Sequence, residues 1–257
     1  MTNLVSVITP VYQPNAEHLD EAYKSLTSQR MPDGWDWQWI VQEDGQTGEV
    51  AALLPSDPRI SAGSGRHGGP GTARTLALSR VDGELVKVLD ADDMLTAGAL
   101  ARDIAVLSTH RHIGWTTSRV LDLLPDGSTV GFDQDPPNGP VSLGAVFDHW
   151  LAHDFRAQVH PATLCIRRSL LLAIGGWMAL PASEDTGLLI AASVLRVGYF
   201  TAETGLLYRK WSGQSTKQTA HTDPIERDAR MAVIQARARA LRSFTMEISP
   251  GSSLAET

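Results

Sequence analysis

The sequence predicts an α/β domain with a mostly parallel sheet, because short apolar runs alternate with helix-like segments over residues 4–109. Two of these runs end abruptly in carboxylates, at Glu43-Asp44 and at Asp90. Ligands of open parallel sheets bind beyond the carboxyl ends of the strands, so the carboxylates also predict a site. A chain of 257 residues is long enough to bury the core of one such domain.

The first half of the chain has the pattern of parallel βαβ units. Trp37 and Trp39 alternate along an expected strand, which places both in the core. The expected elements are a strand at 4–8 ended by Thr9-Pro10, a helix at 16–29 capped by Asn15, a strand at 37–42, a helix at 66–80 that begins in glycines, a strand at 84–89, and a helix to about 109 capped by Thr96.

The second half mixes turns, short strands and helices, so antiparallel additions to the sheet are expected. The long helix at 183–198 is expected to have Ser183 as its N-cap. The other expected elements are a strand pair within 112–131 around Pro125-Asp126-Gly127, a loop at 132–144, a strand at 162–168, a short helix at 169–176 with a glycine stop, strand material at the sheet edge at 199–211, a helix at 224–243, and a disordered polar tail at 250–257.

The composition is that of a globular protein, with 42% hydrophobic and 20% charged residues. A net charge of -7 without a basic cluster argues against nucleic-acid binding. The single cysteine, Cys165, is expected to be buried and permits no internal disulfide. No signal peptide or membrane-spanning segment is expected, which favours a cytoplasmic protein; peripheral membrane contact stays open.

Three aspartates, Asp90, Asp92 and Asp93, follow the strand at 84–89. Carboxylates about 6 Å apart repel one another by roughly 3 kcal/mol per pair at an effective dielectric of about 20, so a cation or a proton is expected among them. Carboxylate oxygens suit Mg²⁺ or Mn²⁺, which typically also bind water and substrate phosphates. An EF-hand would need a glycine and a distal glutamate that this segment lacks. A solvated turn with a helix cap is the alternative.

Six segments in this order, VSVITPVY, QEDG, GPGTARTLAL, GELVKVLDADD, GGW and SED, resemble the family 2 glycosyltransferases with the GT-A fold. The resemblance covers about residues 4–215. It implies a single GT-A domain at 1–215, with a nucleotide-sugar-binding half at 1–110 and an acceptor-binding half at 111–215. A C-terminal helix and polar tail would follow at 216–257.

The resemblance assigns the donor side residue by residue. Pro10 and Tyr12 match positions that line the nucleotide pocket, and Arg74 matches an arginine on the nucleotide side. Glu43 and Asp44 match an acidic pair in which a carboxylate recognises the base. The family more often has two aspartates there, so Glu43 leaves the base preference open.

Asp90 and Asp92 match the DXD motif of the family. By this resemblance Asp92 ligates the divalent metal that bridges the sugar-nucleotide diphosphate, and Asp90 contacts ribose or metal-bound water. Each assignment has a structural alternative: Tyr12 could be core, Arg74 a solvated surface residue, and Asp44 part of a turn with Gly45.

On the acceptor side, Asp185 matches the general base of the family's ED motif, and Glu184 and Trp177 are assigned to acceptor binding. The alternatives are a helix N-terminus favoured by its dipole for the two carboxylates, and plain packing for Trp177. The family often has a histidine that assists the metal or diphosphate where this chain has Trp211. Three further histidines are expected to be ordinary polar residues rather than a zinc site: His149, His153 and His160.

The function implied is inverting, metal-dependent transfer of a sugar from a nucleotide-diphosphate donor to an acceptor hydroxyl, with Mg²⁺ or Mn²⁺ as cofactor. The acceptor is open: a glycan precursor, a protein or a small natural product. One alternative is a degenerate relative that binds a nucleotide or a partner without catalysis. A phosphatase of the haloacid dehalogenase type is another, but its motif requires Thr or Val where Met94 stands.

Overall fold

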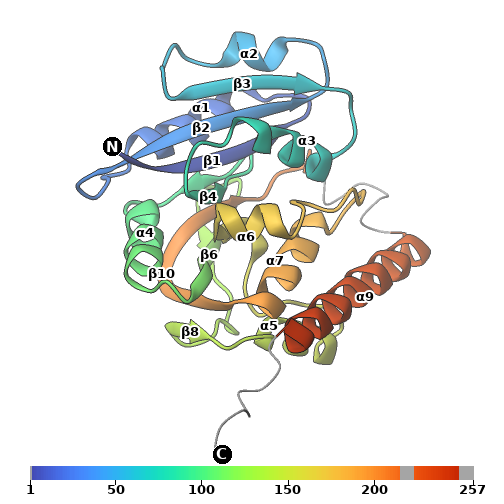
Figure 1. Ribbon diagram of the computed structural model, residues 1–257. Helices are drawn as coiled ribbons and strands as arrows, with labels where there is room; N and C mark the ends of the chain where they lie inside the picture. The colour runs from blue at the N-terminus through green and yellow to red at the C-terminus, as the bar shows by residue number, and fades with distance from the viewer. Residues whose placement is uncertain (1, 215–222, 249–257) are drawn as a thin grey trace, which may run out of the picture.

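The computed structural model describes residues 2–214 and 223–248, in which ten strands form one mixed sheet (Figure 1). The strand order is β3-β2-β1-β4-β9-β6-β10-β5, with β7 beside β6 and β8 beside β10. The strands are β1 (Asn3–Val11), β2 (Trp35–Asp44), β3 (Ile60–Gly65), β4 (Leu85–Val88), β5 (Met94–Leu95), β6 (Ile113–Leu123), β7 (Thr129–Val130), β8 (Gly139–Val141), β9 (Cys165–Arg167) and β10 (Val197–Arg209).

Helices lie on both sides of this sheet (Figure 1). They are α1 (Ala16–Thr27), α2 (Glu49–Leu53), α3 (Pro70–Ala77), α4 (Ala99–Thr109), α5 (Ala145–Ala152), α6 (Arg168–Ala173), α7 (Glu184–Leu195) and α9 (Pro224–Ile248), with short 3-10 turns at Leu78–Arg80 and Pro161–Thr163. The expected boundary at 215/216 and the tail at 250–257 lie outside the described residues. The α/β class with a single helix-flanked sheet is confirmed.

The first half forms the expected parallel sheet. Strand β1 lies between β2 and β4 and is parallel to both, and β3 extends the sheet beyond β2. Trp37 and Trp39 are in the core as predicted, and the Trp39 indole donates to Thr9 Oγ1 at 2.8 Å. Both β1 and β2 run further than expected, so Thr9-Pro10 and Glu43-Asp44 lie within strands. Pro10 lies beyond Val5–Ile8, where β1 pairs with β4, so at this position β1 has a strand neighbour on one side only.

The second half adds the antiparallel pairings. Strand β9 joins the halves, since it is antiparallel to both β4 and β6, and the hairpin β6–β7 is as predicted. The prediction of an edge strand at 199–211 was wrong. Strand β10 pairs with β6 on one side and with β5 and β8 on the other. The expected loop at 132–144 contains β8, a short strand that a hydrophobic pattern could not indicate because it consists of Gly139, Pro140 and Val141.

Two of the three predicted helix caps need correction. Asn15 caps α1 as expected, accepting from Glu17 N and His18 N. Thr96 does not cap α4, which begins after Gly98 in the left-handed region (φ 76°), and the Thr96 hydroxyl donates to Thr204 O instead. Ser183 precedes α7 as expected, but at φ 64° its side chain makes no capping bond.

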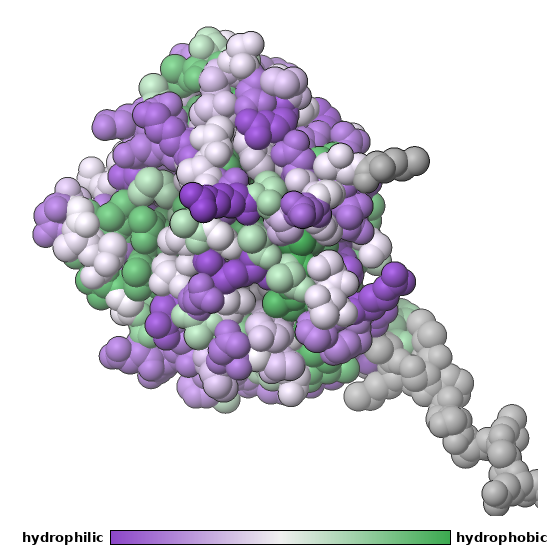
Figure 2. Space-filling model, turned by 90° about the vertical axis from the view of Figure 1, so that its left-hand side faces the viewer, coloured by the Kyte–Doolittle hydropathy of each residue, from purple (hydrophilic) through white to green (hydrophobic). Residues whose placement is uncertain are grey.

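The core consists of two apolar clusters on opposite faces of the sheet. Helix α9 packs across α7 through Met231, Ile234 and Ala238, which are buried in one of these clusters (Figure 1). Cys165 is buried, as predicted. On the face shown in Figure 2, hydrophilic and apolar residues are interspersed. Among the described residues, no helix is long and apolar enough to cross a membrane.

Candidate active site

The predicted site residues of the first half lie at one edge of the sheet. Strands β1, β2 and β4 are parallel, so their carboxyl ends meet there. Tyr12 follows β1, Asp44 ends β2, and Asp90 follows β4. Pro10 lies half-buried within β1, two residues before Tyr12.

Asp44 anchors the glycine-rich loop that precedes α3. Its Oδ1 accepts from Gly68 N at 2.7 Å, and its Oδ2 accepts from Gly69 N at 3.0 Å and lies 2.9 Å from His67 Nδ1. The His67 ring stacks on Tyr12 with centroids 4.4 Å apart. Tyr12 is 52% exposed, so the alternative that it is core was wrong. An aromatic platform backed by a buried carboxylate can hold a flat ring such as a nucleobase.

Glu43 does not act together with Asp44, because adjacent residues of a strand point to opposite faces. Its Oε1 accepts from the amide and hydroxyl of Thr47, each at 2.7 Å, and Oε2 accepts from Gly48 N at 3.2 Å. Although burial opposes it, these bonds lower the pKa of Glu43. Glu43 therefore closes the turn after β2.

Arg74 joins the two predicted motifs. Its guanidinium lies 2.5 Å from Asp90 Oδ1 and 2.6 Å from Glu184 Oε1, and the residue is 3% exposed. The alternative of a solvated surface arginine was therefore wrong. Close approach of α3 to α7 requires Gly71, where a Cβ would lie 2.8 Å from Glu184 Cγ.

The acidic pair that begins α7 has two different environments. Glu184 is 5% exposed, and burial together with Asp185 raises its pKa to about 7, against the effect of Arg74. Asp185 is half-exposed, and its Oδ1 accepts from Thr186 N at 2.6 Å. Glu184 is thus directed to Arg74, and Asp185 is the carboxylate that solvent or a substrate can reach.

Trp177 is 4% exposed and packs in the apolar core. Its backbone is fixed to α3, since Trp177 N donates to Thr75 Oγ1 at 3.2 Å. Of the two alternatives left open by the sequence, the structure shows packing. The ring offers no open face on which a sugar could stack.

The carboxylates after β4 differ strongly in their surroundings. Asp93 is fully buried; its Oδ1 accepts from Arg209 N at 2.9 Å, and its Oδ2 has no hydrogen-bond partner in the described part of the chain. Burial, Asp90 and Asp92 raise the pKa of Asp93 well above its usual range. Asp92 is half-buried, and its Oδ2 accepts from the Trp211 indole at 2.7 Å.

Sequence reasoning gave no role to His160 and Tyr208, which the structure brings to this site. Their rings lie 5.1 Å apart, and both experience the charges of Asp90 and Asp185. His160 Nδ1 accepts from Ala162 N at 3.3 Å, so the neutral ring carries its proton on Nε2. No sequence signal marked His160, because its place depends on packing between distant strands. His149 and His153, by contrast, stack on each other at the end of α5.

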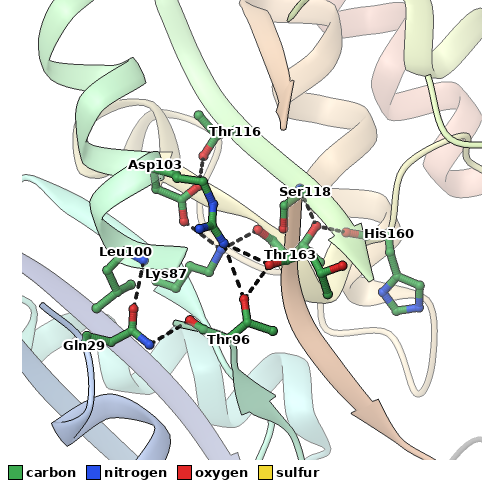
Figure 3. A network of polar contacts seen from close by, with 11 residues as sticks. Gln29, Lys87, Thr96, Leu100, Asp103, Thr116, Ser118, His160 and Thr163 are labelled. Carbon is green, nitrogen blue, oxygen red and sulfur yellow. Dashed lines mark hydrogen bonds and ion pairs between the residues drawn. The ribbon is translucent and has the colours of Figure 1, made fainter. Parts of the chain in front are cut away.

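A buried polar network holds the segment that carries His160 (Figure 3). Lys87 of β4 donates to Asp103 Oδ2 at 2.8 Å and to Thr163 O at 2.7 Å. Thr163 Oγ1 donates to His160 O at 2.7 Å and accepts from Ser118 N at 3.1 Å. In Figure 3 the His160 ring points away from Lys87. The strand that leads to Asp90 is thereby tied to the turn that presents His160.

The donor set at the end of β4 fits a hard divalent cation. It offers the carboxylate oxygens of Asp90 and Asp92, neither of them fully buried, beside the buried Asp93. No group of three or more His, Cys, Asp or Glu side chains in the described ranges is arranged to hold a metal. The cation would therefore take one protein carboxylate and complete its shell with water and phosphate oxygens, which is typical of Mg²⁺ and Mn²⁺.

Comparison with known proteins shows which family the first half of the chain resembles. The model of glycosyl transferase family 2 matches residues 6–129. The poly(ribitol-phosphate) beta-N-acetylglucosaminyltransferase TarS of Staphylococcus aureus is 27% identical over 110 residues, 41% of this chain and 19% of TarS. The match thus spans about a fifth of that relative's length.

Solved structures give the fold. TarS 1-349 in complex with UDP-GlcNAc superposes with a TM-score of 0.69 at 19% identity, over 94% of this chain and 70% of the other. A mannosyltransferase of Pyrobaculum calidifontis, in complex with GDP-Man and Mn²⁺, superposes with a TM-score of 0.58 at 18% identity, over 92% and 64% of the two chains. Residues 6–129 are thus similar to glycosyl transferase family 2, and the fold is that of the solved glycosyltransferases with which the chain superposes.

Proposed function

We propose that the chain transfers a sugar from a nucleoside-diphosphate sugar to an acceptor hydroxyl with inversion, using a divalent metal. One observation carries the proposal. Arg74 binds Asp90 and Glu184, which lie 16 and 110 residues away along the chain. It thereby connects the end of β4, where the donor is expected to bind, with the start of α7, where the general base is expected. If Asp90 only shaped a turn and Glu184 only began a helix, a buried arginine that binds both would not be needed.

On the donor side, in residues 1–110, Tyr12 and Asp44 form a platform for the base next to Pro10. Asp90, held by Arg74, would face the ribose. Asp92 would ligate Mg²⁺ or Mn²⁺, and the bound cation would neutralise charge that develops on the leaving diphosphate. Glu43 shapes the loop beside the base and need not touch the nucleotide.

On the acceptor side, in residues 111–215, Asp185 would take the proton of the acceptor hydroxyl. The acceptor oxygen forms a bond to the anomeric carbon while the bond to the diphosphate breaks on the opposite face, which inverts the configuration. Glu184 and Trp177 would not touch the acceptor. Glu184 would hold Arg74, and Trp177 would pack in the core beneath the acceptor site. The TarS complexes with UDP-GlcNAc and UDP make a uridine donor the first to test.

A second candidate is a family member that binds a nucleotide or a partner without catalysis. Trp211 favours it, because the side chain that contacts Asp92 is an indole, which cannot ligate a metal. Asp185 favours the enzyme, since its carboxylate can be reached from solvent and its neighbour Glu184 is joined to Asp90 by Arg74.

Thermal unfolding in the presence of nucleotides tests the proposal. We expect UDP to stabilise the protein only together with Mn²⁺, by about 2.7 kcal/mol at a hundred times its dissociation constant. GDP, dTDP and CDP should give smaller shifts. Asp92→Ala should abolish the metal-dependent part, whereas the control Asp228→Ala, on the outside of α9, should behave as the native protein.

The outcomes separate the two candidates. A shift that needs neither Mn²⁺ nor Asp92 would favour a binding protein without metal chemistry. No shift with any of the four nucleotides would contradict a donor site altogether. Where UDP binds, UDP-GlcNAc with poly(ribitol phosphate) is the first donor and acceptor pair to assay for turnover.

A further inference from the structure

Trp211 makes a directed contact with Asp92. The residue follows the end of β10, and its indole Nε1 donates to Asp92 Oδ2 at 2.7 Å. An indole N–H is a donor only and has no protonation change in the physiological range. The contact is therefore available at any working pH, and it fixes one of the two carboxylate oxygens.

Two contacts hold the Trp211 ring in place. Its edge contacts the ring of His18 in α1, with centroids 5.0 Å apart and planes at 81°. The chain also folds back onto the ring at Gly213, where a Cβ would lie 2.2 Å from a ring carbon. Only glycine permits this approach, so the ring is packed rather than free to turn.

The Asp92 backbone is fixed as well. Arg209, two residues before Trp211, donates from Nε to Asp92 O at 2.9 Å, and its amide N donates to the neighbouring Asp93. With the backbone and Oδ2 both held, the carboxylate has one orientation. Its Oδ1 accepts no hydrogen bond from any side chain in the described residues, which leaves that oxygen to bind something else.

We propose that Trp211 is a positioning residue for the divalent metal: its indole N–H holds the Asp92 carboxylate so that Oδ1 faces the cation. This rests on the metal use proposed above. Carboxylates that ligate metals are themselves hydrogen-bonded, and loss of such a partner typically weakens metal binding about 10–100-fold. A metal ligand at position 211 is then unnecessary, because the tryptophan acts through Asp92.

Binding of Mn²⁺ in the presence of UDP, followed by electron paramagnetic resonance of the free ion, measures the effect without any acceptor. Trp211→Phe keeps an aromatic ring and removes the donor, and we expect Mn²⁺ to bind about 10–100-fold more weakly. Trp150→Phe is the matched control. The Trp150 indole nitrogen is buried without a hydrogen-bond partner in the described chain, so its removal should leave Mn²⁺ affinity unchanged.

Each outcome decides one question. Equal Mn²⁺ affinity for Trp211→Phe and the native protein, with Asp92→Ala weakened, would overturn the role of Trp211 and leave the metal site intact. Tighter binding by Trp211→Phe would overturn it too, since the indole would then compete with the metal. If native protein and Asp92→Ala both fail to bind Mn²⁺, the metal site itself is wrong. Thermal midpoints verify that both tryptophan variants fold.

Discussion

Asp185→Asn should abolish sugar transfer while leaving donor binding intact. An amide cannot take the acceptor proton, and loss of a general base typically lowers the rate about 10²–10⁴-fold. The fold at this point should not suffer. Asn retains a side-chain oxygen that can accept from Thr186 N, as Asp185 does at 2.6 Å. The substitution also removes a charge that raises the pKa of the buried neighbour Glu184.

Two measurements separate this effect from general damage. The thermal shift caused by UDP with Mn²⁺ should be the same for Asp185→Asn and the native protein, whereas turnover with any working acceptor should fall. Asp148→Asn is the matched control, because Asp148 also lies in the first turn of a helix but is exposed and paired with Arg242. Native rates for Asp185→Asn would show that another group takes the proton; His160 would be the next to substitute.

Local patterns predicted the first half of the fold well, because its strands and helices follow one another and pair with near neighbours. Strands β1, β2 and β4 lie where alternation and buried runs placed them. The errors arose where pairing is distant. Strand β10 was expected at the sheet edge, yet it lies between β6 and β5. No local pattern of residues 197–209 indicates those partners.

The candidate site shows the same limit. The sequence pointed to Asp90, Asp92 and Asp185 as chemically important, and the structure brings Asp90 into contact with the Asp185 motif through Arg74. The sequence could not show the connections themselves. Glu43 and Asp44 are neighbours in a motif, but the two faces of a strand separate them. His160 belongs to no motif, and its neighbours come from other parts of the sheet.

Lys87→Met should destabilise the protein by about 3–5 kcal/mol, which corresponds to a fall of about 10 °C in melting temperature. The Lys87 and Asp103 side chains are 1% and 4% exposed, and their charged atoms lie 2.8 Å apart. Methionine would leave the Asp103 carboxylate buried, with the Thr116 hydroxyl, at 2.7 Å, as its remaining side-chain partner among the residues that the structure describes. It would also leave Thr163 O without its donor.

A surface pair supplies the control. Lys24 and Asp20 approach to 2.6 Å, but their side chains are 71% and 53% exposed, so Lys24→Met should change stability by about 1 kcal/mol or less. Chemical denaturation of the two variants measures the difference. A loss for Lys87→Met no larger than for Lys24→Met would mean that water reaches Asp103 or that it takes up a proton.

The double variant Lys87→Met/Asp103→Leu shows what the buried pair is for. Replacing both partners of a buried ion pair by apolar residues is often neutral, so most of the lost stability should return. The link from Lys87 to Thr163 would still be missing, and Thr163 holds the backbone of His160. Recovered stability with impaired turnover would then indicate that the pair is kept to position His160 beside Asp185. Stability that stays as low as in the single variant would instead show that the ion pair itself stabilises the fold.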